Sequence, residues 1–130
     1  MSRAAAPIYV RVHDLALDVH KMRTSAVAPD LLRALREEAR TVLCEVSLAL
    51  TFVAGRAAHL DGADRALARL KVLVRLASDV GTLDLAARER LGEQIVAIGR
   101  MIGGWQRHSR RPAEAPVSLQ GEAPISARGG

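Results

Sequence analysis

The chain has a single cysteine, Cys44, and almost no aromatic residues, which make up 2% of its 130 positions. One cysteine excludes an intramolecular disulfide and a zinc site built from a cysteine cluster. The first residues, MSRAAAPIYV, lack the apolar run of a secretory signal peptide. No stretch reaches the ~18 uncharged apolar residues of a membrane-spanning helix. We therefore expect a soluble cytoplasmic protein that has no membrane partner.

Lysine is also scarce. Only Lys21 and Lys71 occur among the 19 basic residues, which face 14 acidic ones, so arginine carries nearly all of the net charge of +5. A high-GC genome produces the same preference for arginine, but it does not explain the excess of positive charge. Guanidinium groups suit bidentate contacts with phosphate. The excess predicts a polyanionic partner.

Aliphatic residues dominate what is present, since 49% of the chain is hydrophobic. Four segments repeat apolar residues at steps of three and four, which is typical of amphipathic helices. Proline suits the first turn of a helix and glycine its C-terminal cap, so boundaries are predicted at Pro7, Pro29, Gly55 and Gly81. The four stripes are Ile8, Val12, Leu15, Val19, Met22 and Ala26; Leu31, Leu35, Ala39, Val42, Val46, Ala49 and Val53; Leu67, Leu70, Leu73, Val74, Ala77 and Val80; and Ala87, Leu91, Ile95, Ile98, Ile102 and Trp105.

The links between these segments are short. Residues 56–63, RAAHLDGA, are interpreted as a connector or a frayed turn. Thr82 or Asp84 suits the N-cap of the fourth helix. Short links make successive helices antiparallel, so we predict an all-α, up-down four-helix bundle without a sheet. The bundle is expected over residues 1–111. Residues 112–130 are rich in Pro, Gly, Ala and Ser, and are expected to form a disordered C-terminal tail.

The segment IGRMIGGWQRH, residues 98–108, places two adjacent glycines before the only tryptophan. Glycine costs roughly 1 kcal/mol against alanine inside a helix, so its use here needs a reason. Gly99 and Gly103 lie four apart and can form a smooth groove where another backbone approaches, whereas Gly103 and Gly104 can instead fray the helix end. Trp105 shares the apolar stripe, so it should pack at one end of the bundle or against another subunit.

Two runs carry a resemblance to a known family. LARLKVLVRLASDVGTLDL, residues 67–85, followed by IGRMIGGWQR, residues 98–107, resembles the accessory variability determinant (Avd) proteins of diversity-generating retroelements. Those proteins pair a helix of pattern leucine, basic, x, leucine, x, arginine, leucine, alanine with an ending of glycine, arginine, methionine, hydrophobic, glycine, glycine, tryptophan. The resemblance covers roughly residues 8–107 and is strongest in the third and fourth helices.

The resemblance implies a four-helix bundle that assembles into a basic, barrel-like homopentamer. It also implies two partners, a reverse transcriptase and its template RNA, in error-prone cDNA synthesis that diversifies a target gene. By the resemblance, Lys71 and Arg75 occupy the basic positions of the third-helix pattern. In the ending, the matching positions are Arg100, Gly103, Gly104 and Trp105.

Rows of basic residues border the apolar stripes. Arg33, Arg36 and Arg40 are three and four apart in the second segment, and Lys71 and Arg75 are four apart in the third. Such rows can follow a phosphate backbone without reading bases, although they can also be a solvated face laced with acidic residues. A ring of subunits repeats each row, which favours binding of template RNA or an RNA–cDNA hybrid. The predicted nucleic-acid-binding residues are Arg33, Arg36, Arg40, Arg65, Arg69, Lys71, Arg75, Arg100 and Arg107.

Several apolar or small residues fall outside the core stripes, and Trp105 lies at the end of one of them. They are predicted to seal contacts between subunits or with a partner. The predicted interface residues are Val10, Leu17, Val72, Leu76, Gly99, Gly103, Gly104 and Trp105.

Catalytic signals are weak. His13 and His20 are seven apart, but no carboxylate or cysteine completes a metal set at ligand spacing, so we expect no metal, no cofactor and no enzymatic activity. A helical ribonuclease that uses an arginine followed four to six residues later by a histidine is a rival, yet no such pair occurs here. The main alternative is a protein–protein adaptor bundle with no nucleic-acid role, which predicts binding that is insensitive to salt.

Overall fold

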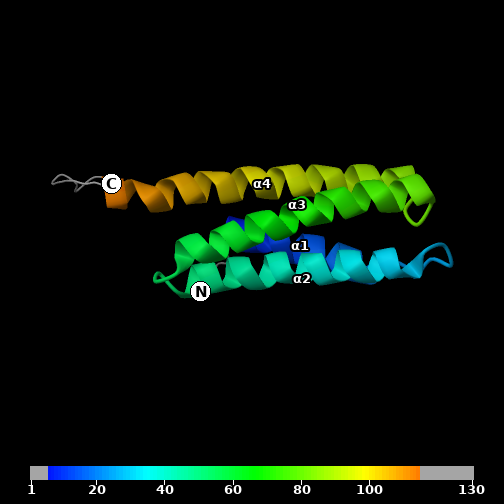
Figure 1. The fold of residues 1–130 in the computed structure, drawn as a ribbon, viewed down its shortest axis with the longest axis horizontal. Helices are drawn as coiled ribbons and strands as arrows, with labels where there is room; N and C mark the ends of the chain where they lie inside the picture. Colours follow the sequence, from blue (N-terminus) through cyan, green and yellow to red (C-terminus); the bar gives the residue numbers. More distant parts are fainter. Residues whose placement is uncertain (1–5, 115–130) are drawn as a thin grey trace, which may run out of the picture.

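The chain folds into four antiparallel helices, described by a computed structural model over residues 6–114, with side chains over residues 6–109. Each helix packs against the next along the chain, and α1 also contacts α4, so the predicted all-α up-down bundle is confirmed (Figure 1). The predicted tail begins within α4, because this helix continues to Glu114; residues 115–130 lie outside the described part. The helices are α1 (Pro7–Lys21), α2 (Pro29–Thr51), α3 (Arg56–Val80) and α4 (Leu85–Glu114).

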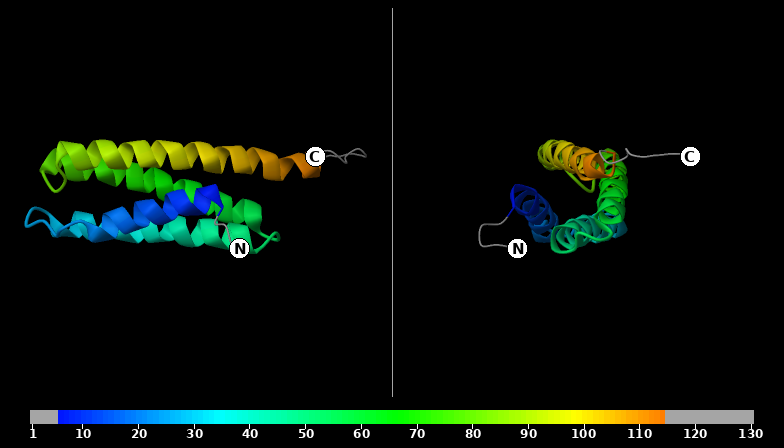
Figure 2. Two further views of the ribbon diagram at one scale, coloured as in Figure 1. Left: turned by 180° about the vertical axis from the view of Figure 1, so that it is seen from behind. Right: turned by 90° about the vertical axis from the view of Figure 1, so that its left-hand side faces the viewer.

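The helices surround one core in chain order, with α1 packed more closely against α2 than against α4 (Figure 2). Within the described residues α1 does not contact α3 and α2 does not contact α4, so each of these pairs lies diagonally across the bundle (Figure 2). The space between the four helices is filled by aliphatic side chains alone, and no polar residue is buried in the described part. Most members of the predicted stripes supply this core, and Leu35, Leu70 and Ile98 are fully buried at its centre. The last predicted members of three stripes are instead exposed, namely Ala26, Val53 and Val80. Hydrophobic burial along four matched stripes therefore holds the bundle together.

The start of α3 corrects one prediction. Residues 56–63 are helical rather than a connector, and Gly55, with a φ of +81°, is the N-cap of α3 instead of the C-cap of α2. Leu60 and Ala63 are fully buried in this stretch, which accounts for its helical conformation. Gly62 fits because a Cβ at that position would lie 2.9 Å from a carboxylate oxygen of Glu45.

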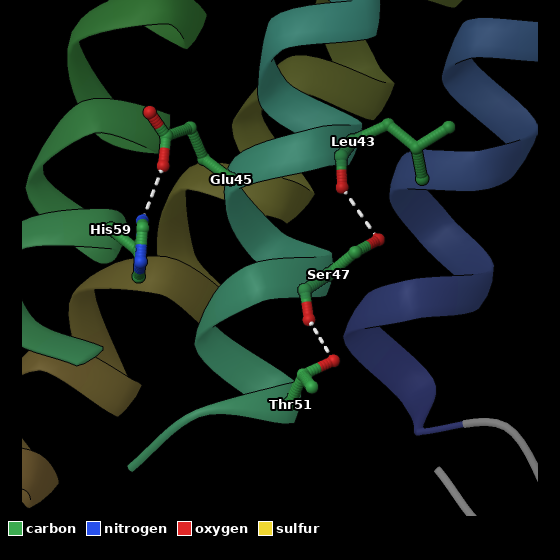
Figure 3. A network of polar contacts seen from close by, with 5 residues as sticks. All are labelled: Leu43, Glu45, Ser47, Thr51 and His59. Carbon is green, nitrogen blue, oxygen red and sulfur yellow. Dashed lines mark hydrogen bonds and ion pairs between the residues drawn. The ribbon is translucent and has the colours of Figure 1, made fainter. Parts of the chain in front are cut away.

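The carboxylate of Glu45 is held over the first turns of α3 by a histidine. His59 Nδ1 lies 2.7 Å from Glu45 Oε1, which joins α3 to α2 across the position of Gly62 (Figure 3). Further along α2, the hydroxyls of Ser47 and Thr51 donate to the carbonyl oxygens one turn earlier, Leu43 O at 2.7 Å and Ser47 O at 2.8 Å. These polar side chains are thus satisfied locally, without a ligand.

The other predicted helix boundaries agree with the structure, and only one of the two candidate caps of α4 is used. Pro7 and Pro29 open α1 and α2. Gly81 closes α3 with a φ of +94°, and Asp84 Oδ1 accepts the backbone N–H of Ala87 at 2.8 Å as the N-terminal cap of α4. Thr82 instead donates its hydroxyl to Val27 O at 2.9 Å, so Asp84 is the capping residue of the two.

The first helix is shorter than its periodicity predicted. It ends at Lys21 rather than near Ala26, and the side chain of Arg36 in α2 donates to carbonyl oxygens at this end. Arg36 Nη2 donates to Met22 O at 2.8 Å, and the same guanidinium reaches Val19 O and His20 O at 3.5 Å each. A cation at a helix C-terminus satisfies orphan carbonyls and complements the helix dipole.

Replacing Arg36 by alanine should therefore lower the free energy of unfolding by about 1 to 2 kcal/mol, since it removes charge-assisted bonds that are partly shielded from solvent. Urea unfolding followed by circular dichroism measures the loss. Arg33→Ala is the matched control: Arg33 lies one turn earlier in α2, is exposed, and makes no hydrogen bond within the described residues, so its change should stay within about 0.5 kcal/mol. Equal losses in the two variants would contradict the capping role.

Candidate nucleic-acid interface

The predicted basic residues divide into those that already have partners and those that do not. Arg36 belongs to the first group through its cap on α1. Arg40 Nη1 lies 3.1 Å from His20 Nε2, Arg69 Nε lies 3.0 Å from Glu38 Oε2, and Arg75 Nε lies 3.3 Å from Asp79 Oδ2. Carboxylates beside Arg69 and Arg75 offset their positive charge, so these two offer little net attraction to phosphate.

Five of the predicted cations are exposed and unpaired within the described residues, and three of these lie outside the hollow that Lys71 and Arg100 share with two glutamates. Arg33, Arg65 and Arg107 make no ion pair or side-chain hydrogen bond within residues 6–109. They lie on α2, α3 and α4 respectively, so they are spread around the bundle rather than gathered in one row. They are the predicted residues best placed to contact a polyanion.

The glycine pair lies beneath Arg107. α4 continues through Gly103 and Gly104, so the pair does not fray the helix in this structure. A Cβ at Gly103 would lie 3.6 Å from Arg107 Nη1, and one at Gly104 would lie 3.8 Å from Arg107 Nη2. Both distances are ordinary van der Waals contacts, so the guanidinium of Arg107 lies against the helix surface at these two positions.

Lys71 and Arg100 share a hollow between α3 and α4. Its volume is about 730 Å³, and Glu89 and Glu93 line it as well. Two cations and two carboxylates face the same space, so this hollow is not a positive patch. Gly99 lies further along the same seam, where a Cβ would be in ordinary contact with Leu67 at 3.6 Å.

The apolar residues predicted to lie outside the core are exposed. Val10 and Leu17 on α1 are 44% and 41% exposed, and Val72 and Leu76 on α3 are 67% and 45% exposed. We call the first pair the α1 face and the second pair the α3 face. The two faces are on helices that lie diagonally across the bundle from each other (Figure 2).

Two further exposed apolar residues were not identified from the sequence. Leu48 of α2 and Val96 of α4 are also exposed. Leu48 lines a hollow with Arg40 and Cys44, and Arg40 in turn lines the adjacent hollow that contains Leu17. Both residues lie outside the apolar stripe of their own helix, and this same feature identified Val10 and Leu17 in the sequence.

Trp105 packs at the end of the bundle, which is one of the two positions predicted for it. Its ring lies partly buried against the core, and the guanidinium of Arg56 lies over it, 5.3 Å from the ring centroid. Arg56 Nε also donates to Ala49 O at 2.7 Å, near the C-terminus of α2. The sequence assigned no binding role to Arg56, because nothing in its local pattern links it to a residue 49 positions away.

The histidines are dispersed. His13 stacks on Tyr9 with ring centroids 5.7 Å apart, His20 contacts Arg40, and His59 contacts Glu45. Within the described part, no group of three or more histidine, cysteine, aspartate or glutamate side chains could hold a metal ion. Among the same residues, none of the helices combines the length and the apolar character needed to cross a bilayer.

Comparison with protein-family models, with curated proteins and with solved structures finds no match to this chain.

Proposed function

We propose that the chain is a non-catalytic accessory subunit of a reverse transcriptase, of the Avd type found in diversity-generating retroelements. In this role it binds the polymerase together with its template RNA or an RNA–cDNA hybrid, and supports mutagenic cDNA synthesis. The observation that carries the proposal is the ending IGRMIGGWQR, whose glycines and tryptophan resemble those of Avd proteins. The four-helix fold is the one that this resemblance implies.

The exposed apolar faces support assembly into a ring. An isologous dimer would cover one face twice and leave the other in water, whereas a contact between the α1 face of one copy and the α3 face of the next uses both. Such head-to-tail contacts close into a ring when the rotation per subunit allows it. The number of five subunits comes from the resemblance.

The net charge of +5 and the unpaired arginines support binding of nucleic acid. A pentamer repeats Arg33, Arg65 and Arg107 five times, so weak single contacts sum to a strong electrostatic attraction. The contacts are to phosphates, which position an RNA strand without reading its sequence. In the proposed mechanism the ring holds the template against the polymerase while the polymerase performs the chemistry.

A pull-down of the tagged full-length chain from the source cells tests this function, with and without nuclease, reading out both proteins and RNA. Recovery of a reverse transcriptase with one structured transcript is the expected result. Retention of the polymerase after nuclease treatment would indicate direct contact between proteins, and its release would indicate tethering through RNA. Recovery of neither partner, from cells shown to express the chain, would overturn the proposal in favour of an adaptor bundle.

A further inference from the structure

A hollow of about 440 Å³ lies at the end of the bundle, where the α2–α3 connection meets α4. Its lining residues are Val53, Gly55, Arg56, Ala57, His108 and Ser109. None of them is acidic, whereas the larger hollow between α3 and α4 contains two glutamates. An arginine, an imidazole and a hydroxyl therefore face one space without a carboxylate to compete for them.

Arg56 is held in place by two contacts that leave its terminal nitrogens free. Its Nε donates to Ala49 O at 2.7 Å, and its guanidinium lies over the ring of Trp105 at 5.3 Å from the centroid. Nη1 and Nη2 make no hydrogen bond or ion pair within the described residues. A guanidinium that is already ordered loses little entropy on binding, and its paired N–H groups match two oxygens of a phosphate.

Basic residues lie on the α4 side of the hollow, and on the α3 side Asp61, one turn after Ala57, accepts a hydrogen bond from Gln106 Nε2 at 2.8 Å. The end of α4 projects past the α2–α3 connection along the long axis of the bundle (Figures 1 and 2). Of the described side chains in this part of α4, Arg107 and His108 are basic and exposed. The first turn of α3 borders the hollow through Ala57, so the positive end of the helix dipole adds to the same field.

We propose that this hollow binds a phosphate group. Arg56 supplies paired donors, Ser109 a hydroxyl and His108 an imidazole nitrogen, while Trp105 acts beneath Arg56 as a positioning residue. The site goes beyond the accessory-subunit proposal, which assigns no role to Arg56 or His108, and it can stand if that proposal fails. A phosphate of this kind is presented by a free nucleotide, by the 5′ end of an RNA strand or by an internal phosphodiester.

The tryptophan provides a direct reporter, because Trp105 is the only one in the chain. Inorganic phosphate is titrated into the full chain at constant ionic strength, with sodium chloride as the balancing salt, and the fluorescence of Trp105 is recorded. A saturable change is expected. Arg56→Gln should weaken phosphate binding at least about tenfold, because charge-assisted hydrogen bonds are lost. Calorimetric titration checks this variant, since removing Arg56 also alters the starting fluorescence.

Two further variants keep the test decisive. His108→Gln changes an exposed side chain outside the core and should weaken binding by about threefold or more with the fold intact. Arg90→Gln removes the same charge as Arg56→Gln from an exposed site near the other end of α4, and should leave the affinity unchanged. A response that does not saturate, or equal affinity in all three variants, would overturn the site.

RNA oligonucleotides of one sequence, with and without a 5′ phosphate, then separate the sources. Tighter binding of the phosphorylated strand places a strand end in the hollow. Equal binding of both strands, weakened in His108→Gln, places an internal phosphodiester there. Saturable binding of inorganic phosphate with no effect of His108→Gln on either strand limits the site to small phosphates such as nucleotides. None of these outcomes depends on recovering a polymerase from cells, so the two proposals can fail separately.

Discussion

Replacing Arg33, Arg65 and Arg107 together by glutamine is expected to weaken binding of single-stranded RNA about fifty-fold at 0.15 M salt, and to reduce the steepness of the salt dependence by about 2 logarithmic units per tenfold change in salt. Both values follow from three phosphate contacts, each of which contributes a slope of about 0.7 on a single strand. The three side chains are exposed and unpaired within the described residues, so their loss breaks no internal contact. Fluorescence anisotropy with a labelled RNA at several salt concentrations measures both quantities.

The matched control is the triple substitution Arg40→Gln, Arg69→Gln and Arg75→Gln. It removes the same total charge, but from side chains that already contact His20, Glu38 and Asp79. A loss of affinity well below that of the first variant is expected, because a phosphate must compete for these guanidinium groups. Equal losses in both variants would show that total charge alone decides binding. Affinity that does not change with salt would instead favour the adaptor bundle.

The helices themselves could be predicted from the sequence, because each buries one stripe of aliphatic residues at a period that a single segment reveals. Leu35, Leu70 and Ile98 were placed in the core on this basis and are fully buried there. The start of α3 could not be predicted in the same way. Its segment RAAHLDGA was interpreted as a connector, whereas in the helix the missing side chain of Gly62 leaves room for the carboxylate of Glu45 on α2.

The site was harder to predict than the fold for the same physical reason. Spacing along α2 placed Arg33, Arg36 and Arg40 on one edge, which was correct as helical geometry. The spacing could not show that Arg36 donates hydrogen bonds to carbonyl oxygens at the end of α1, because those groups lie 14 to 17 positions away in the chain. Likewise Arg56 and Trp105 meet only because α3 begins beside the far end of α4.

The exposed apolar faces lead to a second large effect, on assembly. Wild-type chain is expected to migrate at about five times its monomer mass of 13.9 kDa, whereas Val72→Glu or Leu17→Glu alone should migrate as a monomer at micromolar concentration. Each glutamate would bury an unpaired carboxylate in every contact of the ring, at a cost of several kcal/mol. Both positions are exposed and helical in the single chain, so its own stability should change by less than about 0.5 kcal/mol.

Val27→Glu is the control, because Val27 is 48% exposed but lies in the α1–α2 connection, outside both faces. It should leave the assembly at wild-type mass in light scattering coupled to size exclusion. An assembly that survives both Val72→Glu and Leu17→Glu would show that the subunits meet elsewhere.

Mixing the two single variants distinguishes a ring from a dimer of like faces. Val72→Glu retains an intact α1 face and Leu17→Glu an intact α3 face, so one productive contact remains between them. A head-to-tail interface therefore predicts that the equimolar mixture forms a one-to-one heterodimer, which cannot grow further because its two outer faces both carry a glutamate. An isologous interface predicts no heterodimer, because each face would have to bind the same face of the partner, and one of the two variants carries a glutamate there. A mixture with twice the monomer mass indicates the head-to-tail geometry, and a mass unchanged from that of the separate variants indicates the isologous one. This result does not depend on the number of subunits in the intact ring.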